Sequence, residues 1–349
     1  MSNRTLYSVV VLSALAVQPV VGKIPHTVYE QALPEVVVSE TTKTEKISPT
    51  ILFVGDIMLG RFVETLTKNK GLMYPFDHVV DLLFSADLTV GNFEGIVSKD
   101  HFQTPSGSFR FSIEKENLSH LKDIGFDVVS LANNHSLDFG NEALSYTREY
   151  CSDLLLVCVG TPNALDEYSI AFKSLEEKKI GFVFLNTIFQ KIDTSHLEEV
   201  LEAVATESDV QIVFIHWGDE YQLVHNDDQE ALAMLLIDHG VDAVIGHHPH
   251  VVQDVGLYKG KPIFYSLGNF VFDQYFSQEV QEGLGVEMTI HDTGLEYRLL
   301  PFSSLKSKSQ PRISTDEDAK ALFKRILSGI KSEFQVNQSE GLINVNIES

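Results

Sequence analysis

Three histidines follow a run of small and branched apolar residues in the segment AVIGHHPHVVQ, residues 243–253. An imidazole can bind a transition metal or transfer a proton near neutral pH. His248 and His250 lie two positions apart, so in an extended segment, or in a turn after a strand, both rings can face one ion. His247 points the opposite way in such a segment, and we expect it to have a structural role. The spacing therefore indicates a metal site with His248 and His250 as ligands.

Four further apolar runs end in residues that could join this site. The runs ILFV, LTV, VVSLA and IVFI are followed by carboxylate, amide or imidazole side chains, namely Asp56, Asn92, Glu94, Asn133, Asn134, His135 and His216. In open α/β sheets, ligands bind outside the carboxyl ends of the strands, where loops converge. Oxygen and nitrogen donors without thiolates favour a divalent cation. The predicted metal ligands are Asp56, Glu94, Asn134, His216, His248 and His250. Supporting, capping or substrate-contacting roles are expected for Asn92, Asn133, Asp138, Asp219 and Glu220.

A polar residue at a strand end also has structural explanations, and these stay open at each position. Asp56 could cap the following helix, and Glu94 could be a surface carboxylate in a loop. Asn134 could be a turn residue with left-handed backbone geometry, and His216 could be a hydrogen-bonded core histidine. Trp217, the only tryptophan of the chain, could form a packing wall or a platform for a substrate.

The order of the predicted elements indicates an α/β fold. Short apolar strands alternate with helical patterns, which is typical of βαβ units and a mainly parallel sheet. The predicted helices span residues 78–84, 117–124, 141–151, 195–205 and 228–239, and a more antiparallel set of strands follows within residues 261–302. More than ten strands are many for one open sheet. We therefore expect an αββα sandwich, in which two sheets pack face to face with helices outside.

The two ends of the chain differ in composition from this domain. Residues 1–22 carry one charge, an apolar run and a small-residue end, which predicts a secretory signal peptide or, if uncleaved, a membrane anchor. Residues 23–48 are predicted to be a polar linker, and residues 49–302 the folded domain. Residues 303–349 should contain a second linker and a helix from about 315 to 334. We therefore expect an exported protein of the periplasm or cell envelope.

Charge and cysteine content restrict the partners and the covalent structure. The net charge is -23, and it becomes -24 when the segment with Arg4 is removed, which argues against nucleic acid as a partner. An anionic ligand would need a local cationic site. Cys151 and Cys158 are the only cysteines, and we expect two small buried hydrophobic residues rather than a bridge.

Several of these segments resemble the bacterial capsule-synthesis family of CapA type, which is associated with poly-gamma-glutamate capsules. The matching segments are GDIMLGR (55–61), ADLTVGNFEG (86–95), FDVVSLANNHSLDFG (126–140), HWGDEY (216–221), IGHHPHVVQ (245–253) and KGKPIFYSLGNFVFDQ (259–274). They cover most of residues 50–290 in order. The family is similar in turn to calcineurin-like metallophosphoesterases, and this similarity implies a two-sheet sandwich flanked by helices.

The resemblance also implies roles for individual residues. The metallophosphoesterase ligand pattern is matched by Asp56, by Glu94 as the bridging carboxylate, by Asn134, by His216 and by the closing pair His248 and His250. His135 resembles the histidine that acts near the leaving group. Met58 stands where the pattern has a histidine ligand, and a thioether is a poor ligand for Mn²⁺, Mg²⁺ or ferric iron. One of the two metal positions would therefore lack a ligand.

Three functions are compatible with this resemblance. One or two ions of Mn, Fe or Zn, about 3.5 to 4 Å apart when two bind, could activate water for in-line attack on a phosphoester, with His135 protonating the leaving oxygen. Alternatively, the chain could be a capsule assembly component that holds or exports an anionic polymer together with other membrane capsule-synthesis proteins. A third function is metal-dependent hydrolysis of the polymer's amide bonds.

Overall fold

The computed structural model describes residues 48–189, 191–314, 317–330, 336–337 and 342–345. They belong to one compact unit, Ile47–Ser349. The predicted signal segment and all of the predicted linker except Ser48 lie outside the described residues. None of the helices in the described part of the chain has the length and apolar composition needed to cross a membrane.

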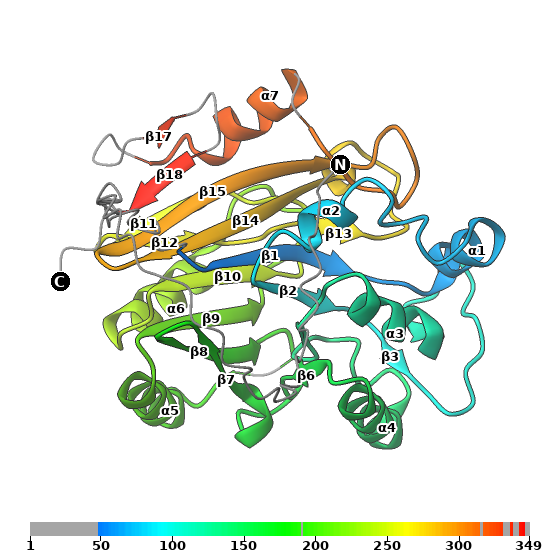
Figure 1. Cartoon of the computed structure of the whole chain (residues 1–349), viewed down its shortest axis with the longest axis horizontal. Coiled ribbons are helices and arrows are strands. Elements are labelled where there is room, and N and C mark those ends of the chain that lie inside the picture. The colour runs from blue at the N-terminus through cyan, green and yellow to red at the C-terminus, as the bar shows by residue number, and fades with distance from the viewer. Residues whose placement is uncertain (1–47, 190, 315–316, 331–335, 338–341, 346–349) are drawn as a thin grey trace, which may run out of the picture. The chain divides into compact units, whose positions relative to one another are not determined.

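Two large β-sheets form the centre of this unit (Figure 1). The first has the order β17 (Val336–Asn337), β18 (Leu342–Val345), β15 (Gly294–Ser303), β14 (Glu282–His291), β1 (Thr50–Ile57), β2 (Leu88–Phe93), β5 (Val128–Ser130) and β6 (Val157–Val159). In addition, β13 (Asn269–Val271) pairs with β1, and β16 (Arg312–Ile313) pairs with β15. Strands β1, β2, β5 and β6 run parallel, whereas β14 and β15 are antiparallel to their neighbours. The sheet is therefore mixed, as the sequence predicted.

The second sheet has the order β11 (Val255–Tyr258), β12 (Lys261–Phe264), β10 (Ala243–His247), β9 (Val210–His216), β8 (Lys178–Asn186) and β7 (Ile170–Leu175). Its four central strands are parallel, and β11 and β7 are antiparallel edge strands. A small ladder joins β3 (Ile96–Val97) to β4 (Ser112–Ile113).

The two sheets pack face to face because side chains alternate in direction along each strand. Ile51 and Phe53 of β1 share a buried hydrophobic cluster with residues of the second sheet such as Phe182. Leu52 and Val54 point to the opposite face of the first sheet, where they pack with residues of α1 to α4. A third cluster joins the outer face of the second sheet to α5 and α6. The structure thus confirms the predicted αββα sandwich.

The helices on the outer faces are close to the predicted ones, with one addition. They are α1 (Arg61–Lys70), α2 (Val80–Leu83), α3 (Lys115–Asp123), α4 (Gly140–Asp153), α5 (Thr194–Glu207) and α6 (Asp227–Asp238). The predicted helix at 78–84 is only the single turn α2. Helix α1 was not predicted, because its polar sequence contains few apolar positions to mark a buried face.

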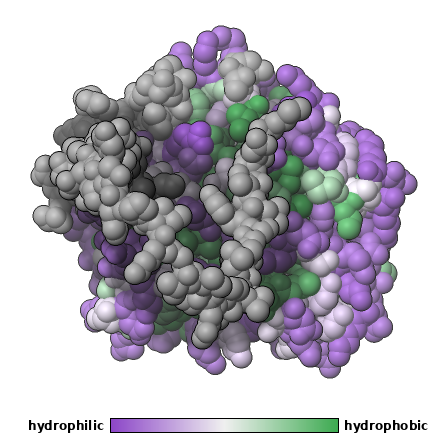
Figure 2. All heavy atoms as spheres, in the orientation of Figure 1, coloured by the Kyte–Doolittle hydropathy of each residue, from purple (hydrophilic) through white to green (hydrophobic). Residues whose placement is uncertain are grey.

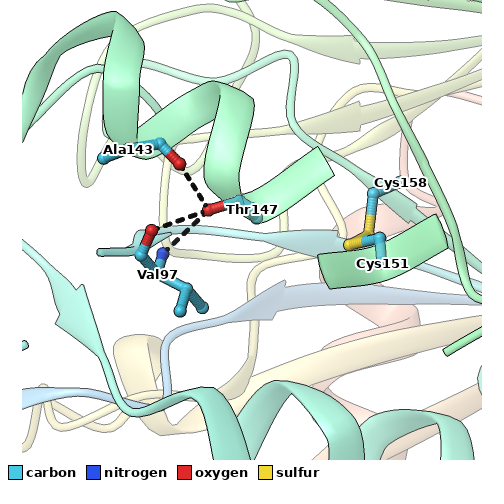
Figure 3. The surroundings of a disulfide bond; sticks show 5 residues. All are labelled: Val97, Ala143, Thr147, Cys151 and Cys158. Atoms are coloured by element: carbon cyan, nitrogen blue, oxygen red, sulfur yellow. Dashed lines mark hydrogen bonds between the residues drawn. A yellow bond between two sulfur atoms is a disulfide. The ribbon is translucent and has the colours of Figure 1, made fainter. Parts of the chain in front are cut away.

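Cys151 at the end of α4 and Cys158 in β6 form a disulfide, so the expectation of two unpaired cysteines was wrong (Figure 3). The chain reverses direction after α4, and β6 passes the end of the helix with the two Cα atoms 5.9 Å apart. One turn before Cys151, the Thr147 hydroxyl lies 2.9 Å from the carbonyl oxygens of Val97 and Ala143 and accepts the Val97 amide at 3.1 Å (Figure 3). These contacts fix α4 against β3.

The last helix described, α7 (Glu317–Ile326), covers one end of the core between the sheets. Leu322, Phe323 and Ile326 belong to the same buried cluster as Ile51 and Phe53. The Arg325 guanidinium donates to the Val252 carbonyl at 2.6 Å. The prediction placed a helix at about 315–334, but residues 315–316 and 331–334 lie outside the described residues.

Candidate metal centre

The carboxyl ends of parallel strands from both sheets meet at one edge of the sandwich. Asp56 in β1 lies opposite Asn92 in β2, and Glu94 follows β2 directly. In the second sheet, the terminal residues of β9 and β10, His216 and His247, lie opposite each other. The His247 ring reaches the other sheet, with Nε2 3.2 Å from the Val54 carbonyl oxygen, and stacks on Phe214. His247 therefore holds the sheets together, which is the structural role predicted for it.

Two groups of donor atoms form at this edge. Asp56, Glu94 and His216 each offer a ligand atom, and these atoms all lie within 4.8 Å of one another. Glu220, His248 and His250 form the second group, which meets the same limit. Except for the exposed Glu220, all of these side chains are buried. The structure also gives Glu220 the position of a potential ligand, where the sequence suggested a supporting role.

The two groups are in direct contact with each other. His248 Nδ1 lies 3.1 Å from His216 Nε2, and His250 Nδ1 lies 3.4 Å from Asp56 Oδ2. His250 Nε2 is 3.6 Å from Glu94 Oε1. The amide oxygen of Asn134 lies 2.8 Å from His216 Nε2. All six predicted ligands therefore gather in one cluster, although they come from five separate segments of the chain.

Burial and mutual charge shift the proton affinities in this cluster. Burial raises the pKa of Glu94 well above its usual range, and the Asp56 charge adds to the shift. Burial and the charge of His248 hold the pKa of His216 well below the ordinary value, and burial with the charge of His250 lowers that of His248 to about 3. Burial alone would lower the pKa of His250, but Glu94 and Asp56 raise it to about 9. At neutral pH, His216 and His248 are consequently neutral and have lone pairs available for an ion.

The cluster also contains a buried carboxylate oxygen that receives no hydrogen bond from the described residues. Glu94 Oε1 receives no hydrogen bond from the described residues, although the side chain is fully buried. Leaving a buried charged or polar oxygen unpaired is costly, and each such atom calls for an explanation. A cation bound between the two carboxylates and the histidines would satisfy this oxygen. Together with the oxygen and nitrogen donor set, this observation fits a divalent metal.

Three asparagines position the potential ligands. The Asn92 amide donates to Asp56 Oδ1 at 2.8 Å and lies 3.3 Å from His216 Nδ1. Asn133 in turn donates to Asn92 Oδ1 at 3.1 Å. Asn269, which the sequence analysis did not single out, has its Oδ1 3.1 Å from His250 Nδ1. It is the first residue of β13 and does not end an apolar strand, so the signal used for the other residues does not identify it.

His135 lies at the side of the cluster, with its ring held from two directions. Its Nδ1 lies 2.9 Å from Asp138 Oδ2, which also accepts the Phe111 amide at 2.7 Å. The Phe111 ring stacks on the imidazole with centroids 3.8 Å apart. His135 Nε2 is 3.8 Å from Glu94 Oε1 and faces the cluster. This arrangement leaves Nε2 free to exchange a proton with a bound ligand.

The backbone around the closing histidines adopts an uncommon conformation. His248 has φ 99° and His250 has φ 57°, both in the left-handed region. Such geometry costs on the order of 1–3 kcal/mol per residue and occurs mostly at functional sites. The Pro249 carbonyl between them accepts the Tyr221 amide at 2.8 Å. The turn is thus fixed by the loop that also carries Glu220.

Met58 does not take part in the cluster. Its side chain is fully buried in the outer apolar cluster of the first sheet, and its sulfur accepts the Gly60 amide at 3.2 Å. Asp219 accepts the Asn226 side-chain amide at 2.7 Å, next to the start of α6. Trp217 is buried, and its indole donates to the Tyr265 carbonyl at 2.8 Å.

Two arginines beside His135 were not identified from the sequence. Arg61 forms an ion pair with Asp273, and its guanidinium lies 4.6 Å from the centre of the Phe111 ring. Arg110 is exposed, and its guanidinium lies over Phe139 and donates to the Asp138 carbonyl. Among the described residues, no carboxylate pairs with Arg110. This side of the cluster can therefore attract an anion.

The residues that form this cluster lie in the part of the chain that matches a family model. Residues 50–274 match the model of the family described as "Bacterial capsule synthesis protein PGA_cap". The chain belongs to this family. It is 33% identical over 258 residues to the "PGA biosynthesis protein CapA" of Bacillus subtilis, covering 68% of this chain and 67% of the relative. It is also 31% identical over 282 residues to the "Capsule biosynthesis protein CapA" of Bacillus anthracis, covering 72% and 68%.

A solved structure shares the fold of this PGA_cap family member at low sequence identity. A hypothetical protein from Thermus thermophilus aligns with a TM-score of 0.50 and 16% identity, covering 72% of this chain and 99% of that protein. A phosphatase from Mycoplasma pneumoniae aligns with a TM-score of 0.43 and 16% identity, covering 76% and 92%.

Proposed function

We propose that this family member is an exported, metal-dependent hydrolase of phosphoester bonds that acts in the synthesis of an envelope polymer. The observation that carries the proposal is the fully buried Glu94 Oε1, which receives no hydrogen bond from the described residues, in a cluster of six further donor residues. The cluster is suited to one or two divalent ions, with Mn, Fe and Zn as the candidates. Glu220 can add a carboxylate ligand beside His248 and His250.

A bound ion would act as a Lewis acid on the phosphoryl group and would lower the pKa of water. The other requirements fall on the chain's own residues. Asp138 fixes the orientation of the His135 ring through Nδ1, so that Nε2 can donate a proton to the leaving oxygen. The asparagine contacts from Asn92 and Asn269 hold Asp56 and His250 in place.

The test of hydrolysis uses purified protein loaded with Mn²⁺ and a panel of nitrophenyl phosphate monoesters and diesters. We expect measurable turnover in the wild type, loss of turnover in His248→Ala, and a decrease of about 10²- to 10⁴-fold in His135→Ala with metal content retained. His196→Ala changes an exposed histidine far along the chain in α5 and serves as the control. Turnover that is unchanged in His248→Ala would refute the hydrolase assignment.

A role in polymer synthesis is supported by the names of the relatives. Two are called PGA or capsule biosynthesis proteins, and a third, from Mycobacterium tuberculosis, is a "Probable polyglutamine synthesis accessory protein". The disulfide supports export, because such bonds persist in oxidising compartments. We expect a deletion strain to lose surface polymer and the wild-type gene to restore it. Normal polymer in the deletion strain would contradict this role.

Met58 stands where the family pattern has a histidine ligand. This difference favours a second function, in which the site binds the polymer without cleaving it. In that case the chain would hold the polymer or contact membrane synthesis proteins. The discriminating result is a retained metal, no hydrolysis of phosphoesters or of polymer amide bonds, and restoration of surface polymer by His135→Ala.

A further inference from the structure

A groove with a volume of about 940 Å³ opens directly beside the metal centre. Three residues line both, namely Asn134, Glu220 and His248. A ligand with one end at the metal centre would therefore extend into this groove. The size lies within the range of pockets that enclose small organic ligands, roughly 300 to 1,000 Å³.

The groove has largely apolar walls. Phe189 and Ile192, from the segment between β8 and α5, line one part of it. Leu232 and Leu235 of α6 line another part, and Trp217 contributes to the wall beside the metal centre. Phe189 is 78% exposed, so the groove presents apolar surface that nothing in the described chain covers. On the face shown in Figure 2, hydrophilic surface predominates, with smaller apolar patches between it.

The charged residues of the groove exclude a polyanion. Its lining includes three carboxylates, Asp219, Glu220 and Asp228, against the single amine of Lys191. A chain of carboxylates such as polyglutamate would be repelled along this path, and the net charge of -23 adds to the repulsion. Positive charge lies instead beside His135, where Arg110 is exposed and no carboxylate of the described residues pairs with it.

We infer that the site takes an amphiphilic phosphoester, with its apolar alcohol portion in the groove and its phosphate at the metal centre on the side of His135 and Arg110. The inference rests on the proposed function for the position of the phosphate. It adds that the substrate is recognised by an apolar chain or ring, and that the polymer itself does not occupy this groove.

Binding can be measured without hydrolysis, because the only tryptophan of the chain lies in the groove wall. Zinc-loaded protein carrying His135→Ala, which should retain metal and hydrolyse phosphoesters slowly, is titrated with hexyl phosphate, glycerol 3-phosphate and a short glutamate oligomer while Trp217 fluorescence is recorded. Burial of about three additional carbon atoms predicts about 60-fold tighter binding of hexyl phosphate than of glycerol 3-phosphate. The glutamate oligomer should not compete.

Variants distinguish the groove from other apolar surface. Leu232→Arg should abolish the preference for hexyl phosphate, and Leu235→Gln should reduce it in a milder way if the arginine variant fails to fold. Leu305→Gln changes an exposed leucine that does not line the groove and should leave the preference intact. Equal affinity for the two phosphates, or displacement by the oligomer, would overturn the inference.

The metal-loaded protein then separates this inference from the proposed function. Cleavage of hexyl phosphate with a higher kcat/KM than glycerol 3-phosphate supports both. Cleavage with no preference refutes the groove assignment alone. Absence of cleavage, together with the fluorescence preference for hexyl phosphate, refutes the hydrolase and retains the groove as an apolar ligand site.

Discussion

Removal of the Cys151–Cys158 disulfide should destabilise the protein by an amount that can be calculated from the fold. The double variant Cys151→Ser with Cys158→Ser keeps similar side-chain volumes and removes only the cross-link. The bond closes a short loop, because the two cysteines are separated by 7 positions. In the chain-entropy model, a closed loop of about eight residues restricts the unfolded chain by about 2.5 kcal/mol at 25 °C.

The loss should appear in the free energy of unfolding measured by urea titration with circular dichroism. We expect the double variant to lose about 2 to 2.5 kcal/mol, and a reducing agent to produce the same loss in the wild type. The reducing agent should have no effect on the variant, which serves as the control for other thiol chemistry. A wild-type protein purified from an oxidising compartment that has two alkylatable thiols, or that is as stable as the variant, would refute the reasoning.

Three further predictions concern the site and the core. Asp138→Asn should lower phosphoester turnover by about 10²-fold or more at unchanged metal content, because His135 loses the carboxylate that orients its ring through Nδ1; equal turnover in steady-state assays would contradict this. Metal affinity should rise with pH up to about pH 9, because Glu94 and Asp56 raise the pKa of His250 to about 9, so that in the metal-free protein His250 holds a proton that an ion must displace; calorimetry in buffers of different ionisation enthalpy should detect this proton release, and pH-independent affinity would refute it. Ile326→Ala should cost about 2–5 kcal/mol in urea unfolding, because this α7 side chain is fully buried between the sheets, and a loss below about 1 kcal/mol would show that α7 does not belong to the core.

The polar site residues at the strand ends could be predicted because the sequence pattern that marks them is local. Each run that ends at Asp56, Asn92 or His216 is apolar along a full strand and changes to polar chemistry at its last residues. Parallel strands place their carboxyl ends at one edge, so residues far apart in sequence meet without any long-range information. Asn269 is the first residue of β13, so this rule does not cover it.

The remaining features depend on contacts that no local pattern contains. The pairing of Cys151 with Cys158 follows from the path of β6 past the end of α4. Their separation of 7 positions in the sequence does not specify that path. Arg110 contacts the Asp138 carbonyl only because the loop before β4 crosses Asp138. Glu220 looked like a supporting residue, and its place beside His248 depends on the Tyr221 amide bonding to Pro249.

The central claim is that residues from separate strand ends bind a divalent ion, and metal analysis of the purified protein tests it most directly. Inductively coupled plasma mass spectrometry of the dialysed protein should find about one or two equivalents of Mn, Fe or Zn per wild-type chain. Asp56→Ala should lose this metal, whereas the exposed control His196→Ala should retain it. A folded wild-type protein that retains no divalent metal, and takes up none when Mn²⁺ or Zn²⁺ is added, would contradict the account.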